Sequence, residues 1–245
     1  ININPLHYES NLELAKIFFS EKSFDQSLNF AKQSNRINTN SFDAHELIGQ
    51  ILFATGKFNE SLKKYKFIFE NCPINQKEKY IPNIASNLIE IDRVKEAKTL
   101  LSQDGSDIGK YNLSLIYLKE GNYSQGWRNF DFGINNNSRK VRSISYFSDK
   151  LELWHPDKKF NSVLVLGEQG IGDEIMYSSL ISDLIDTNIK VGIFMDRRLK
   201  GLLSRSLGNH EFIDNQEEAI QKGYSSYIPL ASLCKFFRNS KDDFE

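Results

Sequence analysis

Cysteine is scarce in this chain of 245 residues, which contains only Cys72 and Cys234. The two lie far apart and match no metal-binding or redox spacing, so we expect reduced thiols in the cytoplasm. No apolar run approaches the ~20 residues that a membrane-spanning helix needs. We also expect no secretion leader, since no basic stretch is followed by an apolar one. These absences predict a cytoplasmic protein with no membrane span, no metal site and no cofactor.

An excess of charge of either sign is lacking too. The 31 Lys and Arg residues nearly balance the 32 Asp and Glu residues, which leaves a formal net charge of -1. This balance gives no electrostatic reason to expect a nucleic-acid partner. The length suits one large domain or two small ones. Because the chain begins with Ile1 rather than Met, we expect a fragment or a processed product.

What the sequence does contain is a repeat, over residues 1–137. Phe24 and Phe58 lie 34 residues apart, each in a short turn between two helical patterns, and later copies are less regular. Small residues recur on both helices of each copy, where they would let two antiparallel helices cross closely. They are Ala15 and Ser27, Gly49 and Ser61, Ala85 and Ala97, and Ser114 and Gly126. The pattern resembles tetratricopeptide repeats, which predicts a helical solenoid of about four helix pairs.

A stacked array of helix pairs has a concave face, and such faces commonly hold extended peptides. The repeat register therefore predicts a groove for a protein or peptide partner. The alternative is that the same side chains are merely solvated or partly packed. The residues expected in the groove are Leu12, Lys16, Phe19, Glu46, Gln50 and Phe53.

Residues 138–161 break the helical pattern and are expected to form a connector. The run Arg139-Lys140-Val141-Arg142 is typical of a solvated surface, with contact to an anionic ligand as the alternative. Trp154 is expected to pack at the domain junction. We expect this connector and the region after it to cover the apolar end of the repeats.

The pattern after the connector alternates strands and helices. Val163–Leu166 reads as a buried strand, Gly170 and Gly172 as a sharp turn, and the residues after Asp173 as an amphipathic helix. Further strands are expected at 190–195, 212–213 and 227–228, and further helices at 197–207 and 217–222. Together they predict a Rossmann-like, doubly wound parallel α/β domain over residues 162–245. Ligands of such sheets bind at the carboxyl ends of the strands.

Four stretches together resemble bacterial tetratricopeptide proteins that carry a glycosyltransferase-like domain. They are GNYSQGWRNFDF (121–132), GEQGIGDEIMYSSLISDL (167–184), DRRLKGLLSRSLGNHEF (196–212) and YIPLASLCKFFRNSKDDF (227–244). The domain is similar to the heptosyltransferases, which implies the N-terminal half of a GT-B fold. The half that usually binds the sugar nucleotide would then be missing, and this fragment alone is expected to be inactive.

The same resemblance implies a catalytic role for Asp173, as the base that takes a proton from an acceptor hydroxyl. Glu168 and Glu174 flank it as alternatives. Gln169, Gly170 and Gly172 would contact the substrate, a glycan or protein acceptor. Read without the resemblance, Asp173 only caps the helix that it opens.

Two other functions remain open from the sequence. One is a non-catalytic scaffold in which the repeats bind a protein and the α/β part is a relic. The other is a dinucleotide-binding Rossmann domain, since Gly170 and Gly172 supply half of the G-x-G-x-x-G fingerprint of such domains. Ile175 stands where the third glycine or alanine belongs, however, and Asp173 and Glu174 would set two negative charges beside the pyrophosphate.

Overall fold

The computed structural model describes residues 7–168, 170–208 and 210–244, and the chain divides into two compact units. Unit 1 comprises residues 1–112 and is helical. Unit 2 comprises residues 113–245 and contains a small parallel sheet. Helix α7 (Asp107–Lys119) runs across the division. None of the helices in the described residues combines the length and the apolar character that crossing a lipid bilayer requires.

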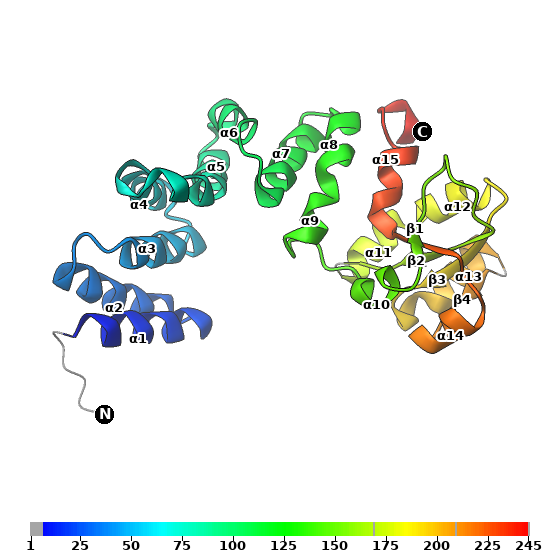
Figure 1. The fold of residues 1–245 in the computed structure, drawn as a ribbon, viewed down its shortest axis with the longest axis horizontal. Helices are drawn as coiled ribbons and strands as arrows, with labels where there is room; N and C mark the ends of the chain where they lie inside the picture. The colour runs from blue at the N-terminus through cyan, green and yellow to red at the C-terminus, as the bar shows by residue number, and fades with distance from the viewer. Residues whose placement is uncertain (1–6, 169, 209, 245) are drawn as a thin grey trace. The chain divides into compact units, whose positions relative to one another are not determined.

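Unit 1 consists of helix pairs, and each helix packs against the next one along the chain (Figure 1). The pairs are α1 (Tyr8–Ser20) with α2 (Phe24–Ile37), α3 (Phe42–Ala54) with α4 (Phe58–Asn71), and α5 (Ile81–Glu90) with α6 (Val94–Leu101). Between α4 and α5 lie two short 3-10 turns, η1 (Ile74–Gln76) and η2 (Glu78–Tyr80). The predicted helical repeat region is confirmed in this form.

Every pair closes in the same way. The residue at the turn has a positive φ, and the following N–H bonds to a carbonyl five residues back, as in a Schellman motif. The turn residues are Lys22, Gly56, Asp92 and Gly121. The donor and acceptor residues are Ser23 and Phe18, Lys57 and Leu52, Arg93 and Leu88, and Asn122 and Tyr117, each pair at 2.8 Å. The fourth closure joins α7 to α8 (Tyr123–Phe130) in unit 2, so the repeat continues beyond unit 1.

The small residues predicted from the sequence let the helices of a pair approach closely. The Ser27 hydroxyl donates to the Ala15 carbonyl at 2.7 Å, and 34 residues further along the Ser61 hydroxyl donates to the Gly49 carbonyl at 2.8 Å. A Cβ on Gly49 would lie 2.8 Å from the Tyr65 ring. Each bond gives a buried serine a partner while adding almost no bulk between the helices.

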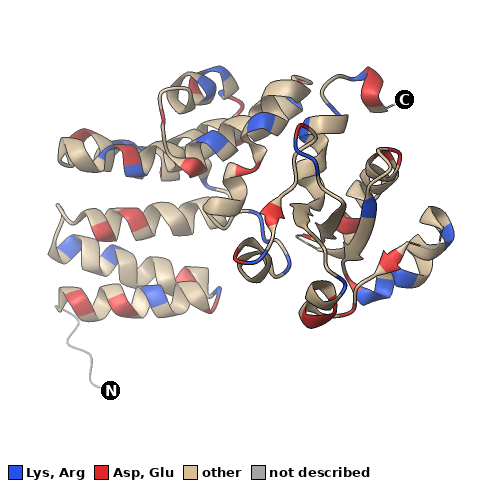
Figure 2. Ribbon diagram, turned by 45° about the vertical axis from the view of Figure 1, so that its right-hand side comes forward, with Lys and Arg blue, Asp and Glu red and all other residues tan. Residues whose placement is uncertain are grey.

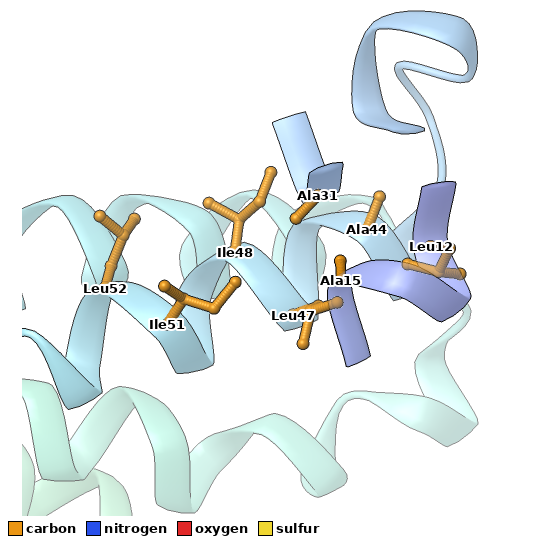
Figure 3. Packing of buried hydrophobic residues seen from close by; sticks show 8 residues of the cluster. All are labelled: Leu12, Ala15, Ala31, Ala44, Leu47, Ile48, Ile51 and Leu52. Carbon is orange, nitrogen blue, oxygen red and sulfur yellow. The ribbon is translucent and has the colours of Figure 1, made fainter. Parts of the chain in front are cut away.

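The buried core shared by α1, α2 and α3 is aliphatic, and Figure 3 shows its members lying together. Large branched residues from α3 pack against alanines of α1 and α2. The members are Leu12, Ala15, Ala31, Ala44, Leu47, Ile48, Ile51 and Leu52. Alanine on one helix opposite isoleucine or leucine on its neighbour fills the space at close interhelical distance.

Unit 2 contains a five-stranded sheet in the order β1-β5-β2-β3-β4, and all its paired strands are parallel. The strands are β1 (Glu152–Leu153), β2 (Ser162–Leu166), β3 (Lys190–Phe194), β4 (Glu211–Phe212) and β5 (Ser226–Pro229). The strand β2 lies between β3 and β5, and all five of its residues are buried, which is typical of a parallel strand whose sheet is covered on both faces. A small parallel sheet in this region was predicted, and it is confirmed. The edge strand β1 was not predicted.

Helices connect the strands from β2 to β5: α11 (Ile171–Tyr177) and α12 (Ser179–Ile185) precede β3, η3 (Arg197–Leu199) and α13 (Lys200–Leu207) precede β4, and α14 (Gln216–Gln221) precedes β5. Before β1 lie α9 (Phe132–Asn135) and α10 (Ile144–Ser148), and after β5 lie η4 (Leu230–Leu233), α15 (Cys234–Phe237) and η5 (Asp242–Phe244). One core cluster joins Phe147 of α10 to Leu164 and Leu166 of β2. Trp154 is also buried, against the ring of Phe236 at 5.4 Å.

Candidate functional sites

The first helices of three successive pairs line two adjoining pockets in unit 1. The first pocket has a volume of about 270 Å³ and is lined by eight of the described residues. Its lining residues are Phe19 of α1, Gln50, Phe53 and Ala54 of α3, Tyr65 of α4, and Asn83, Ser86 and Asn87 of α5. We call this the neutral pocket, because none of these residues carries a charge at pH 7.

A second pocket shares Phe19 and Gln50 with the neutral pocket and adds ionised side chains. It is lined by Lys16, Phe19, Asp43, Glu46, Leu47 and Gln50, and we call it the charged pocket. The Lys16 ammonium lies 2.6 Å from Glu13, and the Glu46 carboxylate lies 3.0 Å from Lys79. Figure 2 shows acidic and basic residues on the same helices.

Five of the six residues expected in a peptide groove line these pockets. Lys16 and Glu46 line the charged pocket, Phe53 lines the neutral one, and Phe19 and Gln50 belong to both. Leu12 differs from the expectation, because it is 5% exposed and packs in the core with Ala15 and Leu47. One turn of helix therefore separates a core position from the pocket-lining positions of α1.

One buried polar atom beside the neutral pocket lacks a partner. Asn87 is 1% exposed, and its amide nitrogen donates to the Asn83 carbonyl at 2.8 Å. Its Oδ1 accepts no hydrogen bond within the described chain. An unsatisfied buried acceptor is costly, so a donor arriving from a ligand would be stabilised there.

A second candidate site lies where the adjacent strands β2 and β5 end. The chain leaves β2 at Gly167 and Glu168, and it leaves β5 through Leu230 and Ala231. The Ala231 N–H donates to the Glu168 carboxylate at 2.5 Å, which ties the two strand ends together. Glu168 is 2% exposed, so this carboxylate lies inside the protein.

Arg139 supplies the opposing charge. Its Nε and Nη2 donate to Glu168, at 2.9 and 2.5 Å, and its Nη1 donates to Asp131 at 2.9 Å. The Asp131 carboxylate also accepts from Ser232 at 2.5 Å and from Lys235 at 2.7 Å. The basic run was expected at the surface, but the Arg139 side chain is completely buried. The network therefore joins the end of α8 to the ends of β2 and β5.

The pKa values of the two acids move in opposite directions. Burial raises the pKa of Glu168, and the Arg139 guanidinium and the Ala231 N–H oppose that rise. Burial acts on Asp131 in the same sense, but Lys235, Ser232 and Arg139 together hold its pKa below the usual range. With both carboxylate oxygens of Glu168 engaged, the group is poorly placed to accept a proton from a substrate.

Glu174 is buried as well, against the glycine that ends β2. Its carboxylate accepts from the Asp196 N–H at 2.8 Å and lies 3.3 Å from Arg142. A Cβ on Gly167 would clash with the Glu174 carboxylate, so this position needs glycine. The sequence pointed instead to Gly170 and Gly172, yet neither has a positive φ.

Asp173 is the accessible carboxylate of the three. It is partly exposed, and its Oδ2 accepts from the Gly170 N–H at 3.1 Å, which caps the start of α11. Gly170 and Gly172 are exposed beside it. Gln169, the third residue expected to contact a substrate, lies outside the described residues. Throughout the described part of the chain, no group of three or more His, Cys, Asp or Glu residues is arranged to hold a metal ion.

Comparison with known proteins adds little to these observations. No protein-family model matches the chain, and no curated protein matches its sequence. Among solved structures, the chain is similar to a thermophilic TPR protein of Thermus thermophilus, with 13% sequence identity. The match covers 54% of this chain and 98% of that chain, with a TM-score of 0.30. Similarity this low does not establish a fold, so the repeat architecture rests on the helix pairs themselves.

Proposed function

We propose that the chain is a tetratricopeptide-type protein that binds an extended segment of a protein partner across α1, α3 and α5. The observation that carries this proposal is the pair of adjoining pockets: α1 and α3 line both, and α5 and Tyr65 of α4 complete the neutral one. Phe19 and Phe53 remain partly exposed there. Partly exposed aromatic rings beside polar amides suit a peptide, whose side chains are apolar and whose backbone needs hydrogen bonds.

A random 12-residue peptide library displayed on phage, selected against the full chain, tests the proposal. We expect enriched peptides that lose binding to the Phe53→Ala variant. The control variant is Phe69→Ala, in α4, since Phe69 lines neither pocket and its ring faces Lys77 instead. The proposal fails if no peptide is enriched, or if enriched peptides bind wild type and Phe53→Ala equally well.

A second proposal concerns unit 2, which we propose is a Rossmann-like half of a GT-B glycosyltransferase. In chain order from β2, the strands β2 to β5 lie in the order 3-2-1-4, which is that of the first four strands of the doubly wound fold. The domain limits expected from the sequence, with repeats to residue 137, a connector at 138–161 and an α/β domain from residue 162, belong to this proposal. In the complete protein, Asp173 would act as the base and Gln169, Gly170 and Gly172 would contact the acceptor.

Two features support Asp173 within this second proposal. It is the one of the three acids with an exposed surface, whereas Glu168 and Glu174 are each 2% exposed and engaged by Arg139 and Asp196. The ends of β2 and β5, near which such folds bind ligands, are occupied by the buried Glu168 and its partners Arg139 and Ala231, so Glu168 is not free to act there instead of Asp173. This chain alone is therefore expected to bind no nucleotide sugar tightly, which calorimetry with UDP-, GDP- and ADP-sugars would test.

A further inference from the structure

The chemistry of the two pockets narrows the class of peptide that the repeats would take. The neutral pocket presents the partly exposed rings of Phe19 and Phe53 together with uncharged amides, and the buried Tyr65 also contributes to its lining. A charged side chain entering it would lose its hydration without gaining an opposite charge. A large apolar or aromatic side chain would instead bury its surface against the rings of Phe19 and Phe53.

The charged pocket has one carboxylate without an ion-pair partner. Glu13 neutralises Lys16, and Lys79 neutralises Glu46. Asp43 also lines this pocket and is exposed, and among the described residues it has no ion-pair partner within 4 Å, although its charge acts on Lys16. Three carboxylates (Glu13, Asp43 and Glu46) therefore face two ammonium groups (Lys16 and Lys79), which leaves one negative charge in excess. The pocket as a whole thus offers a place for one additional positive charge. A lysine or arginine complements it, whereas an acidic side chain would be repelled.

The two pockets meet at Phe19 and Gln50. A single short peptide can therefore occupy both at once. In an extended peptide, residues i and i+2 point to the same side and lie roughly 7 Å apart, which suits two adjoining pockets. The backbone N–H groups of such a peptide are donors of the kind that the unpartnered Asn87 Oδ1 lacks.

From these observations we infer that the repeats select an extended peptide in which a large apolar or aromatic residue lies two positions from a lysine or arginine. The apolar side chain enters the neutral pocket, and the basic side chain meets Asp43. A peptide N–H donates to Asn87. This inference rests on the proposed peptide-binding function and adds the sequence class of the partner.

Selected peptides and charge reversal test the inference. The random 12-residue library is selected against the full chain and, in parallel, against the Asp43→Lys variant. We expect wild type to enrich the apolar residue with Lys or Arg at the second position on either side. Asp43→Lys should enrich Asp or Glu at that position. Asp25→Lys, which makes the same charge change on α2 outside both pockets, should keep the wild-type preference.

Synthetic peptides then test the contacts one by one. In the best wild-type binder, replacing the apolar residue with Ser or the basic residue with Glu should weaken binding at least tenfold by fluorescence anisotropy. Asn87→Leu, which removes the unpartnered acceptor and keeps a similar volume, should weaken binding about fivefold while the melting temperature does not fall. If Asn87→Leu lowers the melting temperature, Asn87→Ser is measured as a second variant, and it must show the same weakening of peptide binding.

The possible failures are distinct. Enrichment of no peptide at all sinks the peptide-binding function itself. Enriched peptides that bind at Phe53 but lack the apolar-plus-basic pattern, or a pattern that Asp43→Lys leaves unchanged, overturn the inference and leave the function standing. If both Asn87 variants bind the peptide with full affinity, no peptide N–H donates to Asn87, and that part of the inference is wrong.

Discussion

Arg139 and Glu168 form a completely buried ion pair, 2.5 Å apart, across 29 residues of sequence. The pair lies at the ends of β2 and β5, where Glu168 also accepts the Ala231 N–H. Three segments that are remote in sequence, around residues 131–139, 168 and 231–235, are thus held by one polar network. Within unit 2, this network ties the end of the last repeat helix to the sheet.

Breaking this pair should destabilise unit 2 strongly. Arg139→Met leaves the Glu168 charge buried without its partner, and such a loss costs about 3–5 kcal/mol. The double variant Arg139→Met with Glu168→Leu should recover part of that loss, because it removes both charges. Urea unfolding followed by tryptophan fluorescence measures the change.

The exposed pair Lys158 and Glu152, 3.3 Å apart, is the matched control. Its side chains are 60% and 69% exposed, so Glu152→Gln should change stability by less than about 1 kcal/mol. Equal changes in the free energy of unfolding for Arg139→Met and Glu152→Gln would contradict the predicted stabilisation by the buried network.

The turns that close the helix pairs predict opposite effects for two substitutions. Gly56 has φ +74 with open space around a Cβ, so Gly56→Ala should cost about 1–2 kcal/mol through backbone strain alone. Lys22 occupies the equivalent turn with φ 61, so Lys22→Gly should stabilise unit 1 by up to about 1 kcal/mol.

Gly105→Ala provides the control, because Gly105 has neither a positive φ nor a neighbour near a Cβ. It should change stability by no more than about 0.5 kcal/mol. Chemical denaturation of the three variants decides the matter, and a destabilised Lys22→Gly would refute the shared turn geometry.

Glu211 on β4 is expected to make the stability of the fold sensitive to acid. Hydrogen bonds from Lys222 and Tyr224, followed by a contribution from Lys190, lower its pKa from 4.5 to about 2. A lowered pKa contributes stability that is present above about pH 4.5 and is lost as the pH falls towards 2. Since the side chain is 33% exposed, solvent screening limits that contribution to about 1 kcal/mol.

Glu211→Gln should therefore lower the melting temperature at pH 7 and narrow the gap to wild type at pH 2. The exposed Glu217 serves for comparison, since Glu217→Gln should follow the wild-type curve at both pH values. Thermal unfolding between pH 2 and 7 provides the data. A constant difference between Glu211→Gln and wild type across this range would disprove the assignment.

Asp173→Asn separates catalysis from helix capping. Asparagine still accepts from the Gly170 N–H, so stability should fall little. In the complete protein, assayed with a nucleotide sugar and its acceptor, kcat should drop by about 10²–10⁴-fold while the acceptor KM moves much less. Full activity would exclude Asp173 as the base, and unfolding of the variant would show that capping is its role.

The repeats could be predicted from the sequence because their determinants are local. Ala15 with Ser27 and Gly49 with Ser61 recur at a fixed interval, and short-range spacing alone reveals a close helix crossing. The buried strand β2 was readable for the same reason, because the continuous apolar run Val163–Leu166 makes up all of it but Ser162.

The buried network could not be predicted, because it depends on tertiary contacts. Arg139 sits in a basic run that is typical of a surface, and its burial follows from partners 8 and 29 residues away. Gly167 likewise looks like an ordinary turn residue until Glu174 folds back against it. Leu12 and Lys16 occupy the same expected face of α1, yet only the packing of α2 and α3 decides which is buried.

Hydrogen–deuterium exchange of the full chain, alone and saturated with the best peptide from the library, tests the central claim most directly. Peptide binding across the neutral and charged pockets should slow exchange in α1, α3 and α5 and around Tyr65 of α4, which line them, and leave α2, α6 and the strands of unit 2 unchanged. Protection confined to unit 2, or to α2 and α6, would contradict a peptide site on the first helices of the repeats.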